Sequence, residues 1–164
     1  MKRNSKGFTL IELLIVVAII GIIVAIAIPN LLNAIQRAKQ RRTMGDIRST
    51  ATAVEAYAVD FNRYPPAAAA TLPSGVIWPG TATLGNNVAT YVSPTYIRVT
   101  PTADGWNSWF LYGTDANGQT YTIGSSGKDG TTSDTVVPGP TTDFNADIVY
   151  ANGQFIQYPE GVQR

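Results

Sequence analysis

The segment KGFTLIELLIVVAIIGIIVAIAIP, residues Lys6–Pro29, decides the fold of this 164-residue chain. Its central part, Phe8–Ile28, is 21 residues long and is apolar except for Thr9 and Glu12. As a helix rising about 1.5 Å per residue it would reach about 31 Å, close to the thickness of the hydrocarbon core of a bilayer. We therefore expect a membrane-spanning helix that follows a short basic segment.

Three interpretations of this segment compete. The first is a cleaved secretory signal, because Ala25-Ile26-Ala27 fits the small-residue cleavage pattern. The apolar region of such signals is shorter, however, at about 7–15 residues. The second is a plain membrane anchor, which explains the length but not Glu12, since an ionisable group at that depth is costly without a partner. The third is a membrane helix that later packs against copies of itself.

The motif Lys6-Gly7-Phe8-Thr9-Leu10-Ile11-Glu12 resembles the processing signal of the type IV filament prepilins, which include type IV pilins and the pseudopilins of type II secretion. The resemblance implies that a prepilin peptidase cuts between Gly7 and Phe8 and that Phe8 is then N-methylated. It also implies that Glu12 pairs with the Phe8 amine of a neighbouring subunit in the filament. The chemistry agrees, because a buried carboxylate needs an opposite charge or hydrogen bonds.

The composition excludes several classes of function. Residues 49–164 carry four basic and nine acidic side chains, so nothing in this part indicates nucleic-acid binding. The chain has no cysteine, and it has no histidine, which is the commonest general base. A faint phosphate-loop pattern at 124–129 has the wrong spacing. We therefore expect a protein that is not an enzyme.

The pattern after the span predicts one long helix to about Asn62, kinked near Pro29 and stopped by Tyr64-Pro65-Pro66. Apolar residues recur along it at spacings of three and four, at Met44, Ile47, Ala51, Val54, Ala58 and Phe61. The expected organisation is a cleaved leader at 1–7, a transmembrane and filament-core helix at 8–29, an amphipathic half-helix at 30–63, a connecting segment at 64–102 and a β domain at 103–164.

Two hairpins are expected in the β domain. The first joins 109–112 to 120–123 through the turn residues 115–118, and the second joins 147–151 to 154–158 through Asn152-Gly153. Asn-Gly is the favoured pair for a two-residue hairpin turn. The predicted fold class is α+β, a pilin-like fold in which the second half of the long helix packs on a small antiparallel sheet.

The C-terminal half is similar to the major pseudopilin of type II secretion, the pseudopilin G family. The similarity rests on Pro94–Ile97, Pro101, Asp104–Tyr112, Tyr121–Gly130 and Asn145–Ile148. Gly105 stands where that family usually has proline, and Asn107 stands where it usually has glycine. The loop from Thr131 to Phe144 is also longer than is typical.

The same resemblance implies a calcium site in this loop region. Calcium takes about six to eight oxygen ligands from carboxylates, carbonyls and hydroxyls. The candidate ligands are Ser125, Asp129, Asp134, Asp143 and Asp147. No EF-hand spacing is present, and the lengthened loop prevents the transfer of individual ligands. A solvated acidic turn region therefore stays open as the alternative.

Taken together, the resemblance implies a structural subunit that polymerises into a periplasmic pseudopilus and drives protein export through a type II secretion system. The alternative is a type IV pilus major pilin, which forms a surface fibre for adhesion or twitching motility. A membrane-anchored domain that does not polymerise is a third possibility. The absence of a C-terminal disulfide pair favours the first, since many pilins have one.

The resemblance also implies a location and a set of partners. We expect a single-pass protein of the cell inner membrane whose C-terminal domain lies in the periplasm. The expected partners are further copies of the chain in a helical filament, minor pseudopilins, the inner-membrane assembly platform with its ATPase, and the prepilin peptidase.

Overall fold

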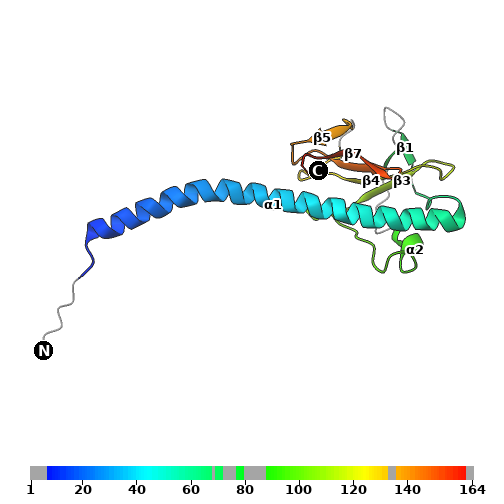
Figure 1. Cartoon of the computed structure of the whole chain (residues 1–164). Coiled ribbons are helices and arrows are strands. Elements are labelled where there is room, and N and C mark those ends of the chain that lie inside the picture. Colours follow the sequence, from blue (N-terminus) through cyan, green and yellow to red (C-terminus); the bar gives the residue numbers. More distant parts are fainter. Residues whose placement is uncertain (1–6, 68, 72–76, 80–87, 133–135, 162–164) are drawn as a thin grey trace. The chain divides into compact units, whose positions relative to one another are not determined.

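The computed structural model describes residues 7–67, 69–71, 77–79, 88–132 and 136–161 (Figure 1). The chain divides into two compact units, Met1–Arg37 and Ala38–Arg164. Helix α1 (Leu10–Phe61) begins in the first unit and continues into the second. It runs through Pro29 without interruption. Asn62 follows it with a φ of 54°, so an asparagine in the left-handed conformation ends the helix where the sequence predicts.

In the second unit, α1 buries one face. The buried residues of this face are Gln40, Thr43, Met44, Ile47, Thr50, Ala51, Ala53, Val54 and Tyr57. The predicted apolar stripe is confirmed as far as Val54, but its last part differs. Tyr57 enters the core with 6% of its surface exposed, whereas Phe61 stays 55% exposed and stacks on the Tyr57 ring with centroids 4.3 Å apart. Edge contacts with Tyr91 and Tyr96 hold Tyr57 in this position.

The β domain contains one sheet of five strands. Its strands are β3 (Leu111–Thr114), β4 (Tyr121–Ser125), β6 (Ile148–Ala151), β7 (Gln154–Pro159) and β5 (Gly139–Thr141), in this spatial order. Three neighbouring pairs are antiparallel, and β5 joins β7 in parallel. The predicted α+β pilin-like fold is confirmed, with a sheet that is mixed because of this one parallel edge strand.

Both predicted hairpins are present. Between β3 and β4, the carboxylate of Asp115 accepts hydrogen bonds from the N–H groups of Gln119 and Thr120 at 2.6 and 2.9 Å. These bonds hold the pKa of Asp115 below its usual range. Between β6 and β7, Asn152 and Gly153 have φ values of 47° and 90°, as a two-residue turn of type I′ requires.

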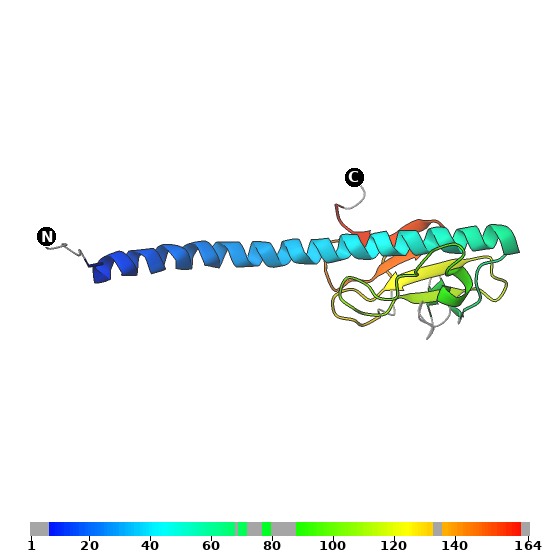
Figure 2. The same ribbon diagram turned by 90° about the horizontal axis from the view of Figure 1, so that it is seen from below.

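Shorter elements complete the second unit. Strands β1 (Ala69–Thr71) and β2 (Ile77–Pro79) form a separate antiparallel pair, and α2 (Val88–Val92) is a helix of five residues. Figure 2 shows the strands of the sheet lying along the second part of α1.

The core is continuous between helix and sheet. Ile47 and Val54 from α1 pack in one cluster with fully buried side chains of the β domain, among them Phe110, Tyr112, Ile123 and Ile148. The hydroxyl of Tyr112 donates to the carbonyl of Pro65 at 3.0 Å, which ties the segment after α1 to the sheet. Burial raises the pKa of Tyr112.

Candidate functional site

The predicted processing site lies at the start of the described chain. Phe8 is 77% exposed, and a Cβ added to Gly7 would meet nothing within 4 Å. The packing of the described residues therefore does not require a glycine at position 7. Its small size is consistent with recognition by another protein, as a cleavage site needs.

Thr9 and Glu12 form a capping box at the start of α1. The carboxylate of Glu12 accepts a hydrogen bond from the N–H of Thr9 at 2.8 Å and another from its hydroxyl at 2.6 Å. In return, the N–H of Glu12 donates to Oγ1 of Thr9 at 3.3 Å. This reciprocal pattern satisfies backbone donors that a helix N-terminus leaves open. The carboxylate is thus held one turn from Phe8, on the element that carries the apolar span.

Helix α1 is long and apolar enough to cross a membrane. None of the residues that the structure describes buries its apolar part. A Cβ on Gly21 would meet nothing within 4 Å. Next to Pro29, the side chain of Asn30 donates to the carbonyl of Ile26 at 3.2 Å. This carbonyl is the neighbour of the Ala25 carbonyl, whose helical partner the proline lacks.

The candidate calcium ligands lie on two neighbouring segments of the second unit. The N–H of Lys128 donates to the carbonyl of Phe144 at 3.0 Å. A Cβ on Gly127 would lie only 2.7 Å from the carbonyl oxygen of Asn145 and 2.8 Å from that of Ala146. The structure therefore brings segment 125–131 against segment 143–147, as a site shared by both would need. Asp134 lies outside the described residues.

Within this pair of segments the candidate ligands have different surroundings. Asp129 and Asp143 are exposed, and each accepts a hydrogen bond from an N–H two residues later, on Thr131 and Asn145. Asp147 is 1% exposed. Ser125 is fully buried and its hydroxyl donates to Oδ2 of Asp104 at 2.6 Å. Its oxygen is thus already part of another network.

The described residues contain no group of three or more Asp, Glu, His or Cys side chains that could hold a metal ion. A calcium ion at this place would therefore take most of its ligands from backbone carbonyls and hydroxyls, together with Asp129, Asp143 or Asp147. Calcium accepts such oxygens. This donor set fits calcium better than a transition metal, which would need nitrogen or sulfur ligands.

Asp104 is the residue that the sequence prediction missed. It is 2% exposed, and its Oδ1 accepts hydrogen bonds from the N–H groups of Trp106 and Ser108, both at 2.9 Å. With the bond from Ser125, this carboxylate fixes the 104–108 loop to the end of β4. An acidic residue followed by small and turn-forming residues was the available signal, but its long-range partner cannot be read from spacing.

Comparison with known proteins places these features in a family. Residues 2–28 match the family described as prokaryotic N-terminal methylation motif, and residues 30–149 match the one described as type II secretion system (T2SS), protein G. The type II secretion system core protein G of Pseudomonas aeruginosa is 30% identical over 137 residues, which cover 79% of this chain and 89% of the relative.

Two further relatives match over a shorter part. The type II secretion system core protein G of Aeromonas hydrophila is 39% identical over 64 residues, which are 39% of this chain and 45% of the relative. The type IV wide pilus major component PilA4 of Thermus thermophilus is 46% identical over 74 residues, which are 45% of this chain and 56% of the relative. The match thus spans about half the length of these two relatives.

Proposed function

We propose that this chain, which belongs to the type II secretion system protein G family, is a structural subunit that polymerises into a periplasmic pseudopilus and so drives protein export. The family consists of filament subunits and is not a catalytic one. Assembly into a homo-oligomer and anchoring in a membrane by α1 follow from this membership and from the N-terminal motif.

One observation supports the proposal most strongly. The apolar half of α1 is exposed in the described chain, and it begins with the Thr9–Glu12 capping box. Large side chains along 8–35 are exposed, for example Leu10 at 78% and Ile26 at 64%. Such a surface is stable only in lipid or against similar helices. A plain membrane anchor would place this surface only in lipid. A filament subunit uses both in turn, first the membrane and then the packed core.

Processing supplies the partner for Glu12 in this scheme. Cleavage between Gly7 and Phe8 creates a charged amine four residues before Glu12. In the filament, the Glu12 carboxylate of one subunit pairs with the Phe8 amine of its neighbour. The capping bonds to Thr9 keep that carboxylate hydrogen-bonded in the membrane until the neighbour arrives.

The proposal also includes the location of the chain and its other protein partners. The chain spans the inner membrane once, with residues 38–164 in the periplasm. A prepilin peptidase cleaves it, and an assembly platform with its ATPase supplies the energy of polymerisation. Minor pseudopilins join the same filament.

A type IV pilin is the second candidate, which the likeness to the Thermus thermophilus pilus component supports. A deletion strain separates the two. Loss of enzyme export with intact surface fibres and motility supports the pseudopilus. Loss of fibres or twitching with normal export supports the pilus. Mass spectrometry of the purified chain tests the processing step, because a protein that begins at Met1 or Ile28 contradicts it.

We also propose that segments 125–131 and 143–147 bind calcium. The pairing of these segments, with the Asn145 and Ala146 carbonyls close to Gly127, supports the proposal. The ion would tie segment 125–131 to segment 143–147, where the chain has no disulfide to do so.

A further inference from the structure

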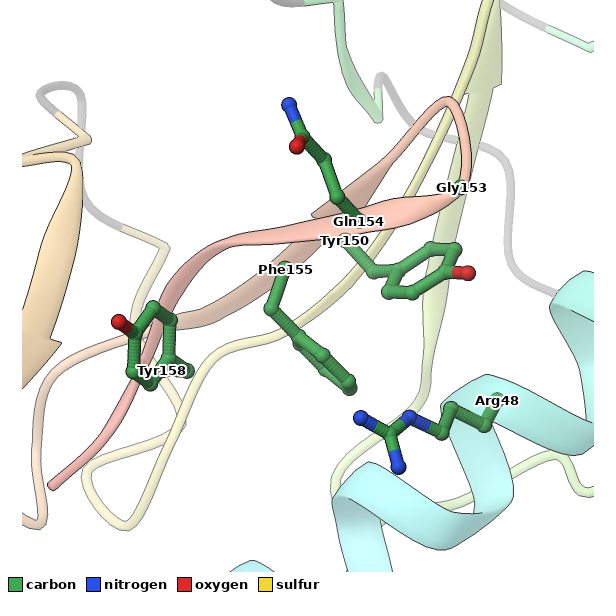
Figure 3. Close-up of a pocket in the computed structure, with 6 residues that line it drawn as sticks. All are labelled: Arg48, Tyr150, Gly153, Gln154, Phe155 and Tyr158. Atoms are coloured by element: carbon green, nitrogen blue, oxygen red, sulfur yellow. The ribbon is translucent and has the colours of Figure 1, made fainter. Parts of the chain in front are cut away.

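A pocket of about 320 Å³ lies in the second unit, along the β6–β7 hairpin and beside Arg48 of α1. Figure 3 shows the residues that line it. It is lined by Arg48, Tyr150, Gly153, Gln154, Phe155 and Tyr158. All of these except Arg48 follow residue 149, where the match to the protein G family ends. The pocket is therefore built mainly from a part of the chain that the family match does not include.

An aromatic side chain holds the guanidinium of Arg48 at the pocket. Figure 3 shows the Arg48 side chain reaching toward the Phe155 ring. The Cζ atom of Arg48 lies 5.3 Å from the centre of that ring. That ring is braced by Tyr150, edge to face, with centroids 4.8 Å apart, and Tyr150 is only 8% exposed. A guanidinium stacked in this way keeps its N–H donors available and loses little freedom when it binds a carboxylate.

Arg48 is the cation that lines this pocket, and it has no ion-pair partner among the described residues. The ion pair of the described chain joins Arg42 to Asp46 at 3.5 Å, and no carboxylate there lies within 4.0 Å of the Arg48 guanidinium. The carboxylate of Glu55, seven residues further along α1, lies beside Gly153 of the pocket, 3.8 Å from where a Cβ on that glycine would be. It accepts a hydrogen bond from the hydroxyl of Tyr121 at 2.5 Å. Arg48 is exposed, so its charge faces the solvent at the pocket.

We propose that this pocket binds an acidic side chain of a second copy of this chain. The proposal rests on the polymerisation proposed above. Charge complementarity selects the occupant, because residues 49–164 carry nine acidic and four basic side chains. Glu160 is an exposed acid of this part that the proposed calcium site does not use. Identical subunits that carry both the pocket and the acid can repeat the contact along an open helical filament. Arginine binds carboxylates with two parallel hydrogen bonds, which adds specificity to the contact.

Photo-crosslinking of the full-length chain in membranes tests this contact. A photoreactive benzoylphenylalanine replaces Gln154, an exposed residue of the pocket lining, and two differently tagged copies are co-expressed. We expect a crosslinked dimer that contains both tags, with the captured peptide carrying Glu160. Arg48→Gln should lower its yield roughly tenfold, the change in an equilibrium that follows from losing one charge-assisted contact. Arg42→Gln, which removes a cation six residues earlier on the same helix, should leave the yield unchanged.

A second variant and a second probe site keep the outcomes distinct. Arg48→Glu should abolish the crosslink, and replacing the acid of the captured peptide by arginine in the other copy should restore it. The same probe at Val16 reports contact between the apolar helices. Two results would contradict the pocket contact while supporting polymerisation. One is a crosslinked dimer from the Val16 probe but none from the Gln154 probe. The other is a Gln154 dimer whose yield does not change when Arg48 is replaced. A crosslink to a different protein would overturn the proposed occupant. No dimer from either site would overturn both proposals.

Discussion

The N–H of Gly105 donates a 2.9 Å hydrogen bond to Oγ1 of Thr43, which places the 104–108 loop directly on the backbone of α1. A Cβ on Gly105 would lie 2.5 Å from the carbonyl oxygen of Lys39. The contact explains why proline is excluded at position 105, and a positive φ accounts for the residue at position 107. Proline at 105 would clash and would lack the donor, and Asn107 occupies a φ of 69° that asparagine tolerates in place of glycine.

Gly105→Ala should lower the stability of the second unit by about 1–3 kcal/mol, because the atom it clashes with is backbone and cannot rotate away. Gly105→Pro should cost more, since it also removes the hydrogen bond to Thr43. Thermal melting of the full-length protein in detergent measures both. Gly45→Ala is the matched control on α1: its Cβ meets nothing within 4 Å, so a gain of about 0.5–1 kcal/mol is expected. Equal effects at 45 and 105 would contradict the close contact.

Asp104→Ala should cost at least about 2 kcal/mol, because it strands the N–H groups of Trp106 and Ser108 and the hydroxyl of Ser125. Asp104→Asn should cost less, since its amide oxygen still accepts the two N–H bonds. Denaturant unfolding checks the order of the two variants. The exposed Glu160→Gln serves as a control with an expected change within about 0.5 kcal/mol. If Asp104→Ala were as stable as the wild type, Asp104 would not anchor the 104–108 loop.

Tyr96 gives a dependence on alkaline pH. Its hydroxyl donates a 2.5 Å hydrogen bond to Asp60, which raises the pKa of Tyr96 to about 12 from its usual value near 10. The folded state therefore keeps this proton more tightly than the unfolded chain. Its contribution to stability is fully present below about pH 10 and is lost as the pH rises through about 12. Melting curves of Tyr96→Phe should decline less than those of the wild type over this range. Parallel declines would show that Tyr96 and Asp60 are not coupled.

Calcium should raise the melting midpoint, and a chelator should lower it again. With free calcium at a hundredfold excess over its dissociation constant, the folded state gains about 2.7 kcal/mol. Magnesium is the control, because it tolerates irregular sets of carbonyl ligands poorly. Asp129→Asn and Asp143→Asn should each reduce the calcium effect without altering the melt in chelator. An identical midpoint in all three conditions would discard the site.

Local sequence signals predict much of the fold. The apolar run and the stripe at Met44 to Val54 predict α1, and Asn152-Gly153 predicts the β6–β7 turn, because these depend on neighbours in the chain. The parallel strand β5 is missed, since Gly139–Thr141 has no strand pattern of its own and pairs with a segment about 18 residues away. The burial of Tyr57 in place of Phe61 depends on α2, which the pattern does not reveal.

In the candidate site, too, local contacts are predicted from the sequence and long-range contacts are not. Residues 7–12 form a local motif, so Thr9 and Glu12 are found from spacing alone. Ser125 is a predicted ligand whose hydroxyl instead binds Asp104, 21 residues earlier. Arg48 and Phe155 meet only because the β6–β7 hairpin packs beside α1. Contacts between distant segments are set by tertiary packing, and neither pair carries a sequence signal.

The yield of sheared filaments from cells that express Glu12→Ala shows whether Glu12 drives assembly by pairing with the Phe8 amine of a neighbouring subunit. Removing one partner of a buried charge pair costs about 3–5 kcal/mol, so this variant should insert into the membrane normally and assemble poorly. Glu12→Gln should also assemble poorly, although its amide oxygen can still accept the bonds from Thr9. Membrane fractionation confirms insertion in both variants. Filament yields equal to that of the wild type would contradict an assembly driven by pairing of Glu12 with the neighbouring Phe8 amine.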